Sequence, residues 1–234
     1  MKIATAVLTR LRHLLSLTAY SIFSDPPPAN YSAYEAYGVG CRGFEHVFSQ
    51  HACGACGAFA ASSVYGMRSC KNGGMDLPSP YRVFDCAHGD CNVGLSVFQL
   101  EASMRSGVND VIKTPLVHGW GCLFDGNADI LKIDAYNFLC LSGVIKREIL
   151  LNGPVLGIFM VPDSFVEYVD GVYAGNEDHA EEEVAHAMAV VGWGAATETE
   201  PEHWIVQNSW GDDWGQGGRG KLAMSPLDCM VTQV

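Results

Sequence analysis

The chain has 234 residues, of which 48% are hydrophobic and 17% are charged, and its formal net charge is −12. A chain of this length and hydrophobic content can bury a core and fold alone. Its acidic balance excludes a surface that neutralises the phosphates of nucleic acid, and no apolar run reaches the roughly 18 residues of a membrane span. We therefore expect a loop-rich globular protein with no nucleic-acid partner and no membrane span.

The cysteines and the first residues bear on the compartment. Nine cysteines are many for a reduced cytosolic protein of this size, and their odd number leaves at least one thiol unpaired. Residues 1–26 are expected to be the remnant of a signal or pro-region, although Arg10, Arg12 and His13 interrupt what should be a clean apolar run in a secretory signal. Asn30-Tyr31-Ser32 is a glycosylation sequon, which matters only if the chain is secreted. These observations fit a protein of an oxidising compartment that keeps one cysteine outside its disulfides.

The predicted elements begin after the prolines at residues 26–28, which cannot continue a helix. Between residues 50 and 143 helical spacing dominates, with Ala60, Val64 and Met67 after Cys56, and then residues 97–104. From residue 153 onward, short apolar runs predict strands at 155–161, 187–191, 204–206 and 222–224. Helices first and strands later indicate an α+β chain of two subdomains with a cleft between them.

The strongest local motif places a thiol where a helix begins. In Gln50-His51-Ala52-Cys53-Gly54-Ala55-Cys56-Gly57, a Gln lies six residues before a Cys that opens the predicted helix. A helix N-terminus carries partial positive charge and free N–H groups, so it favours a thiolate and can bind an oxyanion. Taken alone, the Cys-x-x-Cys pair equally fits half of a zinc site, a thioredoxin-like redox pair, or a structural disulfide cysteine beside a buried one.

Two later motifs decide between these alternatives. His186 opens an apolar run 130 residues after Cys56, and Asn208 follows in Gln207-Asn208-Ser209-Trp210-Gly211. This separation lies within the ~130–150 residues expected between a nucleophilic Cys and its His in one class of thiol enzyme. A nucleophile, a base and an orienting amide are therefore present in the order Cys, His, Asn.

On these motifs the chain resembles the papain-like cysteine peptidases, and their cathepsin B-like branch in particular. Cys41, nine residues before Gln50, and Cys70, fourteen after Cys56, have the spacing of a disulfide of that branch. The resemblance implies a papain-like two-subdomain α+β fold in residues 27–234. A helical subdomain would span 27–145 and a β-barrel-like subdomain 146–234, with the active-site cleft between them. It also implies a lysosome-like or vacuole-like compartment, or secretion.

The resemblance assigns the site residues one by one. Cys56 is the nucleophilic thiolate, His186 is its ion-pair partner and base, and Asn208 orients the imidazole. Gln50 contributes its side-chain amide, with the N–H of Cys56, to the oxyanion hole. The substrate-binding positions implied are Gly94, Ala185, Val234 and Trp210, which would also shield the His–Asn bond. No metal or cofactor is implied.

The resemblance also implies the disulfides Cys41–Cys70, Cys53–Cys91 and Cys86–Cys122. It leaves Cys56, Cys140 and Cys229 unpaired, which accounts for the odd count.

The sequence departs from the family pattern at four points. Gly57 stands where the family has an aromatic residue, Val93 replaces the first glycine of a pair, and Asp90 replaces the glycine before Cys91. About 26 residues precede the peptidase-like part, so we expect no full inhibitory propeptide. The three substitutions alter the cleft without removing a catalytic atom.

Two expectations concern specificity. Residues 230–234 offer no counterpart to the acidic residue that cathepsin B carries after its last cysteine, which favours an apolar side chain two positions before the cut. The 30 residues between Cys91 and Cys122 contain one histidine, His118, so the occluding loop of cathepsin B, with its paired histidines, is expected to be absent. An endopeptidase is therefore predicted. The acidic residues of segment 177–183 are interpreted as a solvated loop rather than as a site for basic groups.

Three functions follow from these observations. The first is a cysteine-type endopeptidase that acts through an acyl-enzyme on Cys56. The second is a weak or inactive papain-like homologue that binds peptides, suggested by Gly57 and the short N-terminal segment. The third is a redox protein that uses Cys53 and Cys56. The expected partners are polypeptide substrates and protein inhibitors of the cystatin type, and the chain is expected to be a monomer.

Overall fold

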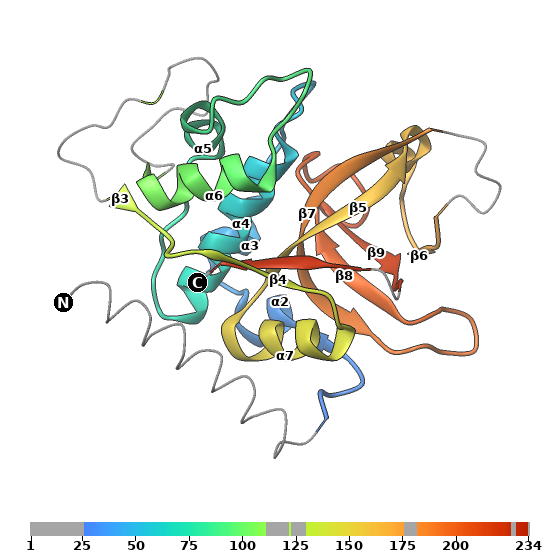
Figure 1. Cartoon of the computed structure of the whole chain (residues 1–234). Helices are drawn as coiled ribbons and strands as arrows, with labels where there is room; N and C mark the ends of the chain where they lie inside the picture. The colour runs from blue at the N-terminus through green and yellow to red at the C-terminus, as the bar shows by residue number, and fades with distance from the viewer. Residues whose placement is uncertain (1–25, 111–121, 123–129, 176–181, 226–227, 234) are drawn as a thin grey trace.

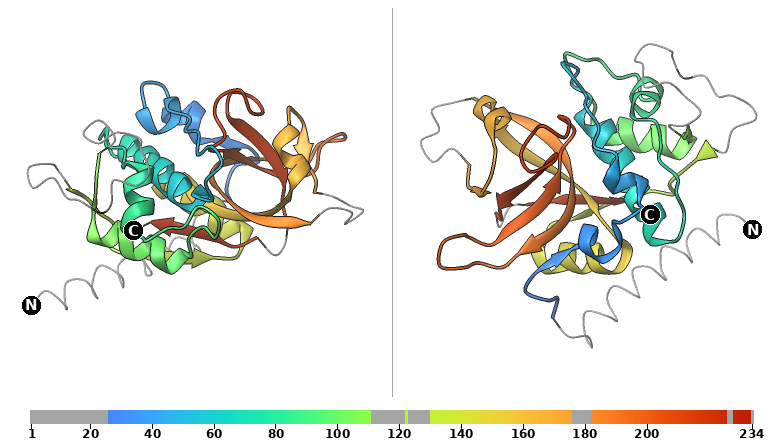
Figure 2. Two further views of the ribbon diagram at one scale, coloured as in Figure 1. Left: turned by 90° about the horizontal axis from the view of Figure 1, so that it is seen from above. Right: turned by 180° about the vertical axis from the view of Figure 1, so that it is seen from behind.

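The computed structural model describes residues 26–110, 122, 130–175, 182–225 and 228–233. A group of helices lies on one side and most of a mixed β-sheet lies on the other (Figure 1). The two further directions of Figure 2 show the same division between helices in cyan and green and strands in orange and red. The predicted α+β fold of two parts is confirmed. Within the described residues, no helix is long and apolar enough to cross a membrane.

The helical part is built around α4 (Cys56–Lys71). Ala60, Val64 and Met67, whose spacing predicts this helix, are buried on it. Four shorter helices accompany it: α2 (Ala33–Tyr37), α3 (Arg42–Glu45), α5 (Pro80–Cys86) and α6 (Val97–Ser106). The start of α6 is capped reciprocally by the side chains of Ser96 and Gln99. A two-stranded sheet of β2 (Val108–Asn109) and β3 (Ile130–Leu131) completes this part.

The larger sheet has the strand order β4-β10-β5-β7-β8-β9-β6, with β1 also paired to β7. Its members are β1 (Tyr31–Ser32), β4 (Tyr136–Leu139), β5 (Val155–Pro162), β6 (Val172–Tyr173), β7 (Glu183–Gly194), β8 (His203–Gln207), β9 (Arg219–Ala223) and β10 (Met230–Gln233). The four predicted strand runs lie in β5, β7, β8 and β9, except that β9 ends one residue before Met224. A short 3-10 helix, η1 (Asp163–Glu167), follows β5.

Helix α7 (Ser142–Asn152) was not among the predicted elements. The predicted subdomain boundary at residues 145–146 falls inside it, and that boundary stays a prediction. The buried residues of α7 include Ile145 and Ile149, one turn apart, and both belong to the same hydrophobic cluster as β5. The helix therefore packs with the sheet (Figure 1).

Strand β7 separates two hydrophobic clusters. Ala187, Ala189 and Val191 belong to the cluster around α4, whereas Met188 and Val190 belong to the cluster of the sheet. This division follows from the strand geometry, in which successive side chains point to opposite faces. Residues on β7 can therefore meet α4 on one face and the sheet's aromatic residues on the other.

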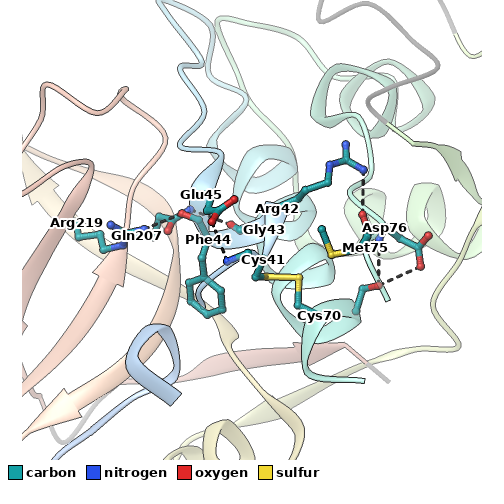
Figure 3. Close-up of a disulfide and its surroundings, with 12 residues drawn as sticks. Cys41, Arg42, Gly43, Phe44, Glu45, Cys70, Met75, Asp76, Gln207 and Arg219 are labelled. Atoms are coloured by element: carbon teal, nitrogen blue, oxygen red, sulfur yellow. Dashed lines mark hydrogen bonds between the residues drawn. A yellow bond between two sulfur atoms is a disulfide. The ribbon is translucent and has the colours of Figure 1, made fainter. Parts of the chain in front are cut away.

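The short helix α3 connects the two parts, as Figure 3 shows. On one side the Cys41–Cys70 disulfide joins it to the end of α4. On the other, two side chains of the sheet donate hydrogen bonds to its carbonyl oxygens: Gln207 to Gly43 at 3.1 Å and Arg219 to Phe44 at 2.7 Å (Figure 3). Both parts are therefore tied to the same four-residue helix.

The structure contains the three disulfides implied by the resemblance, Cys41–Cys70, Cys53–Cys91 and Cys86–Cys122. It also contains a fourth, Cys140–Cys229, so the expectation that these two cysteines are unpaired is wrong. The physical reason is the pairing of β4 with β10, which places Leu139 opposite Met230 and brings the adjacent cysteines together.

A buried ion pair joins α4 to α7. Nη2 of Arg68 lies 2.7 Å from Oε1 of Glu148, a side chain that has no exposed surface. The Arg68 guanidinium also donates to the carbonyls of Pro154 and Gln233. Glu148 accepts further hydrogen bonds from Thr232 and Asn152. One guanidinium thus links α4, α7 and β10.

Candidate active site

Cys56 is the first residue of α4, and among the described residues, which include all nine cysteines, it alone has a free thiol. The loop before it is held by the Cys53–Cys91 disulfide and by a 2.8 Å hydrogen bond from Gly54 N to Cys91 O. A Cβ on Gly54 would lie 2.8 Å from that oxygen, so this close approach requires glycine. The pairing of Cys53 with Cys91 leaves no Cys53–Cys56 couple for redox chemistry.

His186 lies on β7, on the face that packs with the aromatic residues of the sheet. Its neighbour Ala187 faces α4, and the backbone N–H of Ala187 donates a hydrogen bond to the Cys56 thiol. The sulfur therefore lies beside the step from His186 to Ala187, although 130 residues separate Cys56 from His186 in the sequence.

Asn208 is hydrogen-bonded to the imidazole of His186. Its Oδ1 lies 2.7 Å from Nε2 of His186 and accepts a second hydrogen bond, at 2.8 Å, from the N–H of Ser209. The ring of Trp210 lies over the imidazole, with ring centroids 4.5 Å apart. The imidazole of His186 thus contacts both Asn208 and Trp210, and the His–Asn bond is buried.

Gln50 lies beside this group because the segment of residues 48–50 pairs with residues 209–211. Its backbone N–H donates to Ser209 O at 2.9 Å. Its Oε1 accepts a 2.6 Å hydrogen bond from the Ser209 hydroxyl, and its Nε2 donates to Cys53 O at 2.8 Å. The amide is therefore oriented with its N–H groups toward the loop that leads to Cys56. The role of Ser209 in this orientation was not predicted, because no local pattern indicates a contact over 159 residues.

Burial governs the protonation of the Cys–His pair. It raises the pKa of the Cys56 thiol, and hydrogen bonds from the N–H groups of Ala187, Gly57 and Cys56 itself lower that pKa in part. Burial also lowers the pKa of His186, and the bond to Asn208 raises it in part. Burial therefore disfavours the charged form of the Cys56 thiol and of the His186 imidazole when each is considered alone. A low thiol pKa therefore requires the imidazolium as a partner, and the helix N-terminus alone does not supply it.

Comparison with known proteins agrees with this geometry. A family model described as papain family cysteine protease matches residues 34–233, which is most of the chain. The chain belongs to the papain family of cysteine proteases. This confirms the resemblance on which the site residues were assigned, and it supports cysteine peptidase chemistry in this member of the papain family.

Two relatives and one solved structure illustrate the match. A gut-specific cysteine proteinase of Caenorhabditis elegans is 27% identical over 225 residues, with 82% of this chain and 67% of the relative covered. A cathepsin B-like proteinase of Giardia intestinalis is 28% identical over 204 residues, with 80% and 67% covered. Procathepsin B S9 of Trypanosoma congolense superposes with a TM-score of 0.75 at 22% identity, over 90% of this chain and 78% of that one. The likeness to the last is one of fold.

The structure describes three of the four predicted substrate-binding positions, Gly94, Ala185 and Trp210. Gly94 has a φ of 86°, and its N–H donates to Asp90 O, while a Cβ on Gly94 would lie 3.1 Å from Gly54 O. Ala185 is exposed on β7 opposite Met160 of β5. Val234 lies outside the described residues. So do residues 111–121, His118 included, of the segment expected to lack an occluding loop, and residues 177–181 of the acidic segment.

Gly57, the departure nearest to the thiol, has room for a side chain. A Cβ there would meet only Leu100 Cδ2, at 3.7 Å, which is an ordinary contact. We expect Gly57→Ala to raise the free energy of unfolding by about 0.5–1 kcal/mol, because glycine is the less favourable residue in a helix. Thermal or denaturant unfolding measures the change. Gly43→Ala is the matched control and should destabilise, since its Cβ would lie 2.4 Å from Met67 N; loss of stability in Gly57→Ala would contradict the expectation.

Proposed function

We propose that this chain is a cysteine-type endopeptidase that hydrolyses peptide bonds through an acyl-enzyme on Cys56. The observation that carries the proposal is the joint position of three groups. The free thiol opens α4, the N–H next to His186 bonds to that thiol, and the imidazole is held at 2.7 Å by Asn208 beneath Trp210.

The proposed reaction uses these groups in two steps. In the first, His186 takes the proton of the Cys56 thiol, the sulfur attacks the carbonyl carbon of the peptide bond, and the imidazolium returns the proton to the departing amine. In the second, water attacks the thioester with His186 again as base, which releases the acid and restores the thiol. Gln50 Nε2 and the N–H of Cys56 would stabilise the oxyanion in both steps. No metal or cofactor takes part.

An oxyanion role for Gln50 predicts a specific loss. Gln50→Ala should lower kcat by ~10²–10³-fold, because one preorganised donor is removed from the developing charge. Ser209→Ala should cause a smaller loss, since it removes only the hydroxyl that holds Oε1 of Gln50. Steady-state kinetics with one peptide substrate measures both effects. A Gln50→Ala enzyme with unchanged kcat would remove Gln50 from the mechanism.

The surface beside Cys56 supports a preference for an apolar substrate side chain. Ile158 and Met160 of β5 are partly exposed, and Ile158 pairs with Ala187, whose N–H bonds to the Cys56 thiol. Val184 of β7 is exposed near the same end of the pair. A peptide library varied two positions before the cut should therefore favour Leu or Val over Arg. A library that favours Arg would contradict this preference.

Endopeptidase action is proposed from the sequence between Cys91 and Cys122, which lacks the paired histidines that hold a substrate's C-terminal carboxylate in cathepsin B. Matched peptides with free and amidated C-termini distinguish the two modes. Internal cleavage at equal rates supports an endopeptidase, whereas release of a terminal dipeptide only from the free acid would show an exopeptidase. Cystatin-type inhibitors, a monomeric state and a lysosome-like, vacuole-like or extracellular location belong to the same proposal.

Catalytic competence itself is tested by labelling. An epoxide that alkylates activated thiols should label the wild-type protein once, and Cys56→Ala should abolish both labelling and peptide cleavage. Peptide binding without labelling or cleavage would instead support a non-catalytic homologue that retains the cleft.

A further inference from the structure

A hollow in the surface adjoins the proposed catalytic centre. It has a volume of about 490 Å³ and is lined by Ser49, His51, Val166, Trp210, Asp213 and Trp214. It shares Trp210 with the imidazole stack of His186, and two of its lining residues flank Gln50 in the sequence. The hollow therefore adjoins the residues that would carry out the reaction.

The position of the hollow assigns it to the leaving side of the substrate. Gly94, on the loop bound to Gly54 and Cys91, lies on one side of Cys56 and is the proposed partner of the substrate backbone before the cut. The hollow lies beyond Gln50 and Trp210, along the pairing of Ser49 with Trp210. An extended chain that passes over Cys56 from Gly94 would place the residues after the cut against it.

The walls of the hollow are apolar and fixed. The rings of Trp210 and Trp214 meet edge to face at 5.6 Å, and each also contacts the ring of Phe165. The indole N–H of Trp214 donates to Phe165 O at 3.2 Å, which holds the ring in place. Val166, more than half exposed, forms part of the rim. Such a surface suits the methylene chain of a long side chain, and indole faces attract cations.

The lining of the hollow also includes a carboxylate. Asp213 is exposed and has no hydrogen-bond or ion-pair partner within the described residues. His51 lies at the same hollow, with its Nδ1 3.4 Å from the Ser49 hydroxyl. Its φ of 51° is a conformation that non-glycine residues seldom adopt, so the backbone here is held by its surroundings.

We propose that this hollow selects a basic side chain, lysine or arginine, among the first three residues after the cut, and that Asp213 is the residue that determines this preference. The head group would pair with the carboxylate and the stem would lie on Trp210 and Trp214. The inference rests on the proposed peptidase function and adds a substrate class to it.

The test uses three sets of matched internally quenched peptides, which place lysine, norleucine or glutamate at the first, second or third position after the cut. For the wild-type protein, kcat/KM should be about three- to ten-fold higher for lysine than for norleucine at one of these positions, and lowest for glutamate. Asp213→Asn should bring the lysine-to-norleucine ratio close to one, through a fall in kcat/KM for the lysine peptide.

Two variants control for other causes. Asp212→Asn removes the same charge one residue away, outside the lining of the hollow, and should keep the preference for lysine. His51→Asn removes the imidazole, and asparagine tolerates the same positive φ. This variant should also keep the preference for lysine. An unchanged ratio in Asp213→Asn, an equal loss in Asp212→Asn, or a wild-type preference for glutamate would each overturn the proposal.

Failure of the proposed reaction would be recognised separately. If no peptide is cut, the affinities of the same peptides for the Cys56→Ser protein are measured by fluorescence anisotropy. A higher affinity for lysine peptides that Asp213→Asn abolishes would support the proposed specificity of the hollow even though the peptidase reaction had failed. Equal affinities for lysine and norleucine peptides would overturn the proposed specificity.

Discussion

Replacing His186 with alanine is expected to lower kcat/KM for a peptide substrate by ~10⁴–10⁶-fold, because nucleophile and base act as one unit. Cys56→Ser should cause a loss of the same order, since a hydroxyl is a far weaker nucleophile in a site built for a thiolate. Asn208→Ala should retain part of the activity, because it leaves both reacting groups in place and removes only the 2.7 Å bond that orients the ring. Steady-state kinetics on purified protein measures all three.

The pH dependence of thiol alkylation gives an independent readout of the same pair. Burial raises the pKa of the Cys56 thiol, so without the imidazolium the thiolate forms only as the pH rises above the ordinary thiol range of about 8.5. The wild-type protein should be alkylated at weakly acidic pH, and His186→Ala should lose this reaction and regain it only at alkaline pH. His88→Asn, at an exposed position away from the site, is the control and should behave as the wild type. Identical profiles for His186→Ala and wild type would refute the ion pair.

The second large effect is expected on stability. Glu148→Ala should lower the free energy of unfolding by about 3–5 kcal/mol, because it leaves the guanidinium of Arg68 buried without its counter-charge. Denaturant unfolding with the disulfides intact measures the change. Glu200→Ala, which breaks the partly exposed pair with Lys221, is the matched control and should cost no more than about 1 kcal/mol. Equal effects of the two substitutions would show that the buried pair has no special role.

The same pair predicts how stability depends on acid. Burial alone raises the pKa of Glu148, but Arg68 and hydrogen bonds from Thr232, Arg68 and Asn152 more than offset this and leave its pKa below the ordinary value. A carboxyl group with a lowered folded-state pKa stabilises the fold above its unfolded pKa of about 4.3, and this stability is lost as the pH falls through the folded-state value. Wild type should therefore lose more stability than Glu148→Gln between pH 5 and about 3, as followed by urea unfolding at each pH.

Several elements and the candidate catalytic residues could be predicted from local sequence, because the patterns that indicate them are short. The spacing of Ala60, Val64 and Met67 depends only on helix geometry, and these residues are buried on α4 as that geometry requires. The apolar runs that predict β5, β7, β8 and β9 likewise indicate a buried strand without any knowledge of the strands beside it. The order of Cys56, His186 and Asn208, with their separations, was sufficient to indicate a thiol peptidase.

What remained undetermined depended on pairings between distant segments. The resemblance leaves Cys140 and Cys229 unpaired, and nothing near either residue in the sequence indicates that β4 and β10 are neighbours. The register of these two strands brings the cysteines together. The bond from Ser209 to Gln50 arises from the pairing of residues 48–50 with 209–211.

By itself, then, the sequence determined the chemical groups, the types of the main elements and the family of this chain, since each of these depends on residue identity and short-range spacing. Only the tertiary structure decided the fourth disulfide, the orientation of the Gln50 amide, the raised pKa of the Cys56 thiol and the hollow that contains Asp213. The physical reason is that burial, and contacts between residues 89 or more positions apart, are set by strand register and by the packing of α4 against β7, which no local pattern encodes.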